Sequence, residues 1–202
     1  MILITTVGEL FTGGRHGAHR CLLATLLATA FVAVLTGAPT GQALRVDEAP
    51  ALVVYEADGI YIVNASFAVA AAPAAVLRVL TNYDAIPRVV PDVLTSVVVS
   101  RRGGDLVVEQ VAVSRLLFFS KTVQLRLHVQ ETTEGLEFYD VGRQSFALYE
   151  GGWRVKAKPW GSAVTYHLRA QPSFEVPEFL IKRVLKRDAR QMIDRLRKAM
   201  VS

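Results

Sequence analysis

Hydrophobic and polar residues alternate through the middle of the chain and predict a series of β-strands. Residues 121–131 alternate most cleanly, with Val123, Leu125, Leu127 and Val129 separated by polar side chains. A period of two places the two kinds of side chain on opposite faces of a strand. Comparable segments lie at 60–69, 93–100, 105–113, 136–142, 152–158 and 163–170. Because the connections are short and contain turn residues, we expect one antiparallel sheet with one wet face.

The pattern changes to a helical period at the end of the chain. From Pro177 to Met200 the apolar residues recur at spacings of three, four and one, which predicts a helix of roughly 35 Å with one apolar stripe. The opposite face of this helix is basic. A basic helix face is usually solvated, and the alternative is that it docks on anionic lipid headgroups. The basic residues of this face are Lys182, Arg183, Lys186, Arg187, Arg190, Arg195, Arg197 and Lys198.

The stretch LTNYDAIPRVVPDV (80–93) separates the first strand from those that follow. A short helix is expected from Pro73 to about Leu80, because proline is tolerated in the first helical turn. Asp84 can cap a second short helix, which Pro91 ends. An ordinary loop would be more polar than this segment. We therefore expect two short helices, bent around a corner, that cover an apolar surface.

The N-terminal region has the pattern of a secretory signal. Residues 21–35 carry no charge, Arg15 and Arg20 precede them, and small residues follow at Gly41 and Ala43. We expect a signal peptide over 1–43 and export, most simply to a bacterial periplasm. An uncleaved anchor in the inner membrane is the alternative. Residues 44–58 are expected to be a linker or N-terminal extension, and 59–202 the folded domain.

Composition limits the possible functions. Hydrophobic residues make up 51% of the chain and charged residues 20%, which excludes wholesale disorder and allows a sizeable core. Cys21 is the only cysteine and lies in the predicted signal, so disulfides, thiol catalysis and cysteine-based zinc sites are excluded. Without the signal the net charge falls from +5 to +4, because Arg15, Arg20 and Glu9 are removed. The chain is therefore mildly basic, and for an exported protein we expect an anionic membrane surface rather than nucleic acid as its partner.

Three segments resemble the START-like (SRPBCC) superfamily, in particular its polyketide cyclase/dehydrase and coenzyme Q-binding families. They are APAAVLRVLTNYDAIPRVVPDV, GGWRVKA and TYHLRAQPSFEVPEFLIKRVLKR, and the resemblance covers about Gly59 to Met200. It implies an α+β helix-grip fold, in which a curled antiparallel sheet wraps around the long C-terminal helix. The superfamily includes lipid carriers and cyclases on one scaffold.

The resemblance also implies a cavity between the sheet and the long helix. Tyr83, Ile86, Val89 and Val90 would cap it, and we expect a space large enough for a hydrocarbon guest. The alternative is a solid core that these side chains complete. The candidate ligand-binding residues are Tyr83, Ile86, Val90, Glu109, Leu125, Leu127, Tyr149, Trp153, Tyr166, Leu185 and Met192.

Few residues have the pattern of a catalytic set. His128 and His167 fall on the polar side of their strands, whereas a general base should face a pocket. No cluster of metal ligands and no G-x-S-x-G motif occurs, so no metal or other cofactor is expected. Glu109 shares a strand face with three valines, and burial there would raise its pKa. It would then be an acid or a hydrogen-bond partner for a ligand. The alternative is a structural carboxylate paired with Arg143 or Arg154.

We expect the chain to bind or transport a hydrophobic ligand, such as a lipid, a quinone or another isoprenoid, rather than to be an enzyme. Each buried methylene contributes about 0.8 kcal/mol, so a hydrocarbon tail would be held without specific polar contacts. The alternative is a cyclase or dehydratase acting on polyketide-like aromatic substrates, with Glu109 and Tyr166 moving protons. A third hypothesis is a structural or chaperone-like module that uses the basic helix as a partner surface.

Overall fold

The computed structural model describes residues 48–116, 119–174 and 178–202, with side chains except at 114–121 and 175–179. The predicted signal peptide, 1–43, lies outside the described residues. Within the part of the chain that is described, no helix has both the length and the apolar character needed to cross a bilayer.

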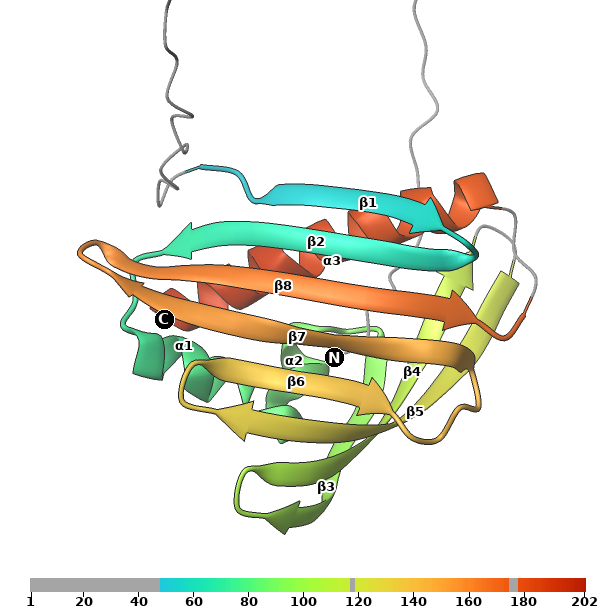
Figure 1. Ribbon diagram of the computed structural model, residues 1–202, viewed down its shortest axis with the longest axis horizontal. Coiled ribbons are helices and arrows are strands. Elements are labelled where there is room, and N and C mark those ends of the chain that lie inside the picture. The colour runs from blue at the N-terminus through green and yellow to red at the C-terminus, as the bar shows by residue number, and fades with distance from the viewer. Residues whose placement is uncertain (1–47, 117–118, 175–177) are drawn as a thin grey trace, which may run out of the picture. The chain divides into compact units, whose positions relative to one another are not determined.

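One antiparallel sheet contains all the described strands (Figure 1). Each of the seven predicted strands is present, and neighbours from β3 to β8 pair in chain order. The last strand, β8, also pairs with β2. The order across the sheet is β1 (Ala51–Ala57), β2 (Ile60–Val69), β8 (Gly161–Pro172), β7 (Phe146–Lys158), β6 (Gly135–Asp140), β5 (Phe119–Thr132), β4 (Asp105–Leu116) and β3 (Val93–Arg102).

Strand β1 occupies part of the segment that was expected to be a linker. It pairs with β2 from Ala51 to Ala57, so the sheet begins before the expected domain boundary at Gly59. A two-residue turn joins the strands, with φ of 54° at Asp58 and 77° at Gly59. Asp-Gly is a favoured pair for such hairpin turns because both central residues need positive φ. The backbone N–H of Gly59 also donates to Glu56 Oε1 at 2.6 Å.

The long helix α3 (Glu178–Val201) lies along the concave side of the sheet (Figure 1). It packs against β1 and β2 and against the first short helix. The predicted apolar stripe is confirmed, because its members face the core. The buried members are Ile181, Val184, Ala189, Met192, Ile193, Leu196 and Met200.

The segment between β2 and β3 folds as three short helices, which we call the lid (residues 73–90). These are α1 (Pro73–Leu80), the 3₁₀ turn η1 (Tyr83–Ala85) and α2 (Ile86–Val89). The start of α1 at Pro73 is as predicted. The predicted cap at Asp84 is wrong: Asp84 lies inside η1, and Ala85 precedes α2 without a side-chain capping bond. The chain turns instead through backbone bonds, such as Val90 N–H to Ile86 O at 2.7 Å.

The strands divide their side chains between the two faces as the alternation predicts. Val123, Leu125, Leu127 and Val129 of β5 are buried, while the polar residues between them are exposed or half-buried. The same inward faces of the other strands join the lid and α3 in one apolar core. A curled antiparallel sheet around a long C-terminal helix, with short helices after the first strands, is the helix-grip architecture expected from the sequence.

Candidate ligand-binding site

A small cavity lies beneath the lid, between it and the central strands. Its volume is about 10 Å³, which is room for about one water molecule. The sequence led us to expect a chamber large enough for a hydrocarbon guest, and this cavity, as the described residues line it, is far smaller than that. The lining side chains are Leu80, Tyr83 and Ile86 of the lid and Val108, Gln110, Leu127, Val129, Leu136, Phe138 and Trp153 of the sheet.

Gln110 is the polar side chain that β4 contributes to this lining. It is 1% exposed, and its Nε2–H donates to Ser96 Oγ of the neighbouring strand at 3.0 Å. Its Oε1 is buried and has no hydrogen-bond partner among the described residues. A buried amide oxygen without a partner is costly, because it has lost its hydration without replacement. This residue is therefore unlike the apolar side chains around it.

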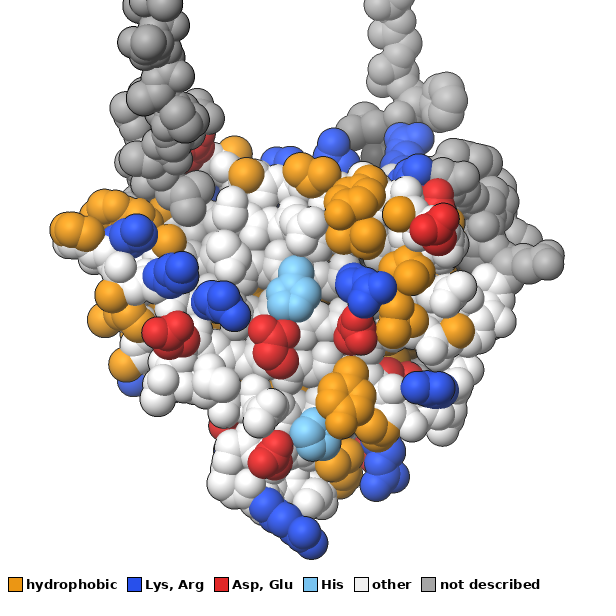
Figure 2. Space-filling view, in the orientation of Figure 1, with side chains coloured by type: hydrophobic (Ala, Val, Ile, Leu, Met, Phe, Trp, Pro, Cys, Tyr) orange, Lys and Arg blue, Asp and Glu red, His pale blue; other side chains and the backbone are white. Residues whose placement is uncertain are grey.

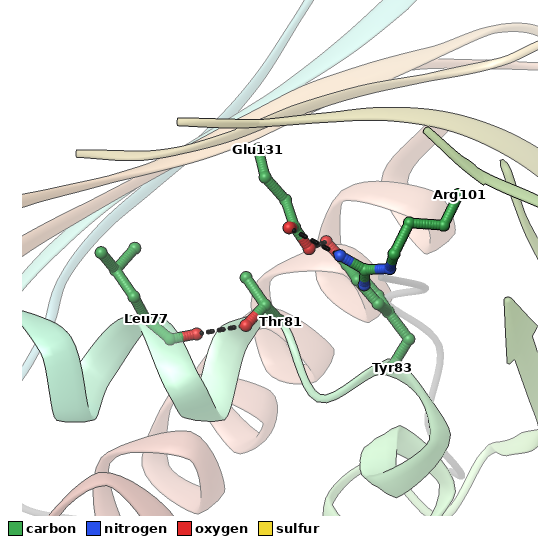
Figure 3. A network of polar contacts seen from close by, with 5 residues as sticks. All are labelled: Leu77, Thr81, Tyr83, Arg101 and Glu131. Carbon is green, nitrogen blue, oxygen red and sulfur yellow. Dashed lines mark hydrogen bonds and ion pairs between the residues drawn. The ribbon is translucent and has the colours of Figure 1, made fainter. Parts of the chain in front are cut away.

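Tyr83 ties the lid to the rim of the sheet (Figure 3). Its hydroxyl donates to Glu131 Oε1 of β5 at 2.9 Å, and Arg101 Nη1 of β3 lies 3.1 Å from Glu131 Oε2. Burial of the ring, followed by the bond to the carboxylate, raises the pKa of Tyr83 well above its ordinary value. The tyrosine is therefore a hydrogen-bond donor at neutral pH. We call these three side chains the latch.

Phe138 and Gly151 shape one wall of the cavity. They are register partners on β6 and β7, and a Cβ at Gly151 would lie 2.9 Å from Phe138 Cζ and 2.4 Å from the carbonyl oxygen of His167. A glycine within a strand often marks such a close backbone approach. The missing side chain gives the Phe138 ring its place against the wall.

Aromatic rings pack against two of the lining side chains. Tyr166 packs against Trp153, and Tyr149 packs against Phe138. The ring centroids of Trp153 and Tyr166 are 4.4 Å apart. Tyr166 is buried, and its hydroxyl has no hydrogen-bond partner among the described residues. Burial raises the pKa of Tyr166 and of Tyr149 above the ordinary tyrosine value. Both phenols therefore keep their protons at neutral pH and are not bases.

The structure contradicts the expected position of Glu109. Its side chain is 48% exposed and lies 3.0 Å from Arg126, its register partner on β5, rather than from Arg143 or Arg154. The inward positions of β4 belong to Leu106, Val108, Gln110 and Ala112. Glu109 therefore does not contribute to an interior site, either as an acid or as a ligand contact.

The other predicted site residues divide into two groups. Tyr83, Ile86, Leu127 and Trp153 line the cavity. The rest belong to the surrounding core: Val90, Leu125, Tyr149, Tyr166 and Met192 are buried, and Leu185 is partly buried against them.

Sequence reasoning missed six lining residues. Most are ordinary inward positions of alternating strands, and only Gln110 carries a signal, as an amide among inward apolar residues. The six are Leu80, Val108, Gln110, Val129, Leu136 and Phe138.

Both described histidines lie on the outer face of the sheet among charged side chains (Figure 2), as the alternation predicts. His128 Nε2 is 3.8 Å from Asp105, and His167 Nε2 is 3.3 Å from Glu137. Within the described ranges, no group of three or more His, Cys, Asp or Glu side chains is arranged to hold a metal ion.

The solved structures with this fold include three crystal structures. A protein from Thermus thermophilus is 20% identical, with a TM-score of 0.59, over 69% of this chain and 97% of its own. A STAR-related lipid transfer protein from Xanthomonas axonopodis is 15% identical, with a TM-score of 0.58, over 77% and 100%. The aromatase/cyclase ZhuI from Streptomyces sp. R1128 is 11% identical, with a TM-score of 0.60, over 70% and 94%. At these identities the likeness establishes the fold alone.

No curated protein sequence matches the chain significantly. A family match covers residues 69–197, which include the lid, the strands from β3 to β8 and most of α3. The match includes well over half of the sequence. The chain therefore belongs to the polyketide cyclase / dehydrase and lipid transport family, within the START-like superfamily that its sequence resembles.

Proposed function

We propose that the protein binds a hydrophobic ligand, such as a lipid or an isoprenoid, in the space beneath the lid. The observation that carries the proposal is the lining of the cavity, in which eight of the ten side chains are apolar. Burial of a ligand tail against them contributes about 0.8 kcal/mol for each methylene. A tail of about ten methylenes would then contribute about 8 kcal/mol, part of which offsets the cost of opening the site.

Binding requires the lid to move, because the closed cavity holds about one water molecule. The helices of the lid are 8, 3 and 4 residues long, and helices this short depend on packing for their stability. The lid is therefore the element that can detach at least cost while the paired strands remain intact. In this account the apolar interior closes on itself when empty and opens around a guest.

The cyclase or dehydratase alternative needs a proton donor and acceptor inside the cavity. Its candidate base, Glu109, lies on the outer face. The polar side chains that line the cavity in the described structure are Gln110 and Tyr83. An amide does not transfer protons, and Tyr83 keeps its proton because its pKa is raised. The lining thus favours binding over acid–base catalysis.

The proposal is tested by purifying the full chain, extracting it with organic solvent and analysing the extract by mass spectrometry. We expect one recurrent class of hydrophobic molecule, present in amounts that approach one per chain. The stripped protein should then bind that class, with a change in tryptophan fluorescence because Trp153 lines the cavity. A Trp160→Phe variant leaves Trp153 as the only tryptophan reporter. Empty extracts, together with no fluorescence response to lipids or isoprenoids, would contradict the proposal.

We also propose that α3 brings the site to an anionic membrane surface after export to the periplasm. The proposal is supported by the predicted signal peptide and by the exposed basic residues of α3, Arg183, Lys186, Arg190 and Lys198. Each basic residue near such a surface contributes about 1 kcal/mol of attraction. A carrier of poorly soluble molecules gains from this contact, because its ligand enters and leaves without crossing water.

A further inference from the structure

Gln110 occupies a position at which an amide is not needed for packing. It lies on β4 between Ser96 of β3 and Leu125 of β5. Its inward neighbours along the strand are Val108 and Ala112, both with no exposed surface. A residue chosen for packing alone would be aliphatic here, as those neighbours are.

The hydrogen bond to Ser96 fixes how the amide is used. Nε2 donates to Ser96 Oγ at 3.0 Å, so the amide group is anchored through its nitrogen. Its oxygen remains buried without a partner among the described residues. An amide oxygen only accepts hydrogen bonds, so the group that completes it must carry an O–H or an N–H.

The surroundings narrow the choice of donor. The lining is apolar apart from Gln110 itself and Tyr83, whose hydroxyl already donates to Glu131. An ammonium group would lose its hydration in such a place without a countercharge, which is strongly unfavourable. A neutral hydroxyl has nearly the size of the water molecule that the cavity can hold.

We propose that Gln110 Oε1 accepts a hydrogen bond from the hydroxyl group of the bound ligand, which is therefore a hydrophobic alcohol or phenol. This inference rests on the proposed function and deepens it, because it names the head group. A quinone, a ketone or an ester presents only acceptors to Oε1 and leaves it unsatisfied. A bare hydrocarbon does the same. Of two ligands with the same hydrocarbon tail, the site thus binds the one with a hydroxyl group more tightly.

The test is a fluorescence titration of the full chain with 1-dodecanol and with 2-dodecanone. Each dissociation constant is calculated from the concentration of free probe. We expect the wild type to bind the alcohol about tenfold more tightly than the ketone, the range of one neutral hydrogen bond. Gln110→Leu should bind the two probes about equally. Gln124→Leu, a matched change at an exposed position of β5, should keep the preference.

Three results would overturn the inference. They are equal binding of the two probes by the wild type, tighter binding of the ketone, or an unchanged preference for the alcohol in Gln110→Leu. Failure of the proposed function is distinct, because the wild type would then bind neither probe. A melting curve gives a second readout. Gln110→Leu removes the unsatisfied amide oxygen and should therefore raise the melting temperature. If the Ser96–Gln110 bond were purely structural, the melting temperature of this variant would fall.

Discussion

Gln110 and Glu109 are adjacent, and a single strand places one inside and the other outside. The sequence did not decide between them because valine occurs on both faces of β4. Val108 is fully buried, whereas Val107 and Val111 are only half-buried on the other face. A one-residue change of register exchanges the faces of a strand. Glu109 does share a face with Val107 and Val111, but this is the outer face of the sheet and not the inner one.

At the same scale, Tyr83 sets how readily the lid opens. Its bond to Glu131 is lost in Tyr83→Phe, while the ring and its packing remain. One such bond contributes about 1 kcal/mol, so the open population should rise about fivefold. We expect ligand association and dissociation, followed by stopped-flow fluorescence, to accelerate by about that factor, with little change in affinity.

Tyr139→Phe is the matched control, because Tyr139 is 49% exposed on the outer face of the sheet. Its kinetics should equal those of the wild type. Unchanged rates in Tyr83→Phe would show that the latch does not control entry.

The buried tyrosines predict a loss of stability at alkaline pH. Burial raises the pKa of Tyr83, Tyr149 and Tyr166 above the ordinary value near 10. Below pH 10 the native and unfolded states both keep these protons. Above pH 10 the unfolded chain loses them and the native state retains them, so the free energy of unfolding falls as pH rises. The slope is at most about 1.4 kcal/mol per pH unit for each tyrosine.

This slope can be measured by urea unfolding between pH 8 and pH 11. Tyr166→Phe should remove one tyrosine's share of it, because phenylalanine does not titrate. The same slope in both proteins would contradict the assignment of a raised pKa to Tyr166.

At the scale of the elements, alternation and helical periodicity were sufficient for most of the sheet and for α3. Strand β1 was missed because its seven residues follow a polar segment and because Asp58-Gly59 was not used as a hairpin signal. The inward residues Leu52 and Val54 of β1 pack on the core, and β1 contacts α3. The strand thus completes the sheet over the helix at the edge opposite to β3.

The basic face of α3 supports a prediction about membranes. A variant with Arg183, Lys186, Arg190 and Lys198 changed to Gln should lose most of its binding to vesicles that contain phosphatidylglycerol. The reason is that each charge contributes about 1 kcal/mol near an anionic surface. Cosedimentation at low and at high salt measures the effect, and salt should weaken the wild type because it screens these charges.

Vesicles of phosphatidylcholine alone are the control, and both proteins should bind them weakly. Equal cosedimentation of the variant and the wild type with anionic vesicles would contradict a role for this face.

At the scale of the whole molecule, the architecture could be predicted and the size of the cavity could not. The fold follows from which face of each element is apolar, and this is visible in the sequence. The cavity volume is the small difference between the space inside the sheet and the side chains that fill it. That difference depends on local packing, such as Phe138 over Gly151, which no periodicity reports.

The most direct test of the account is photo-crosslinking with a long-chain alcohol that carries a diazirine at mid-chain. After irradiation of the full chain, labelled peptides are identified by mass spectrometry, with unlabelled alcohol as competitor. We expect labels on the lid and on inward residues of β4 to β7, around Leu127, Phe138 and Trp153, and these labels should disappear when unlabelled alcohol is added. Labels confined to the exposed apolar residues of the edge strand β3, such as Val97 and Val99, would contradict an interior binding site.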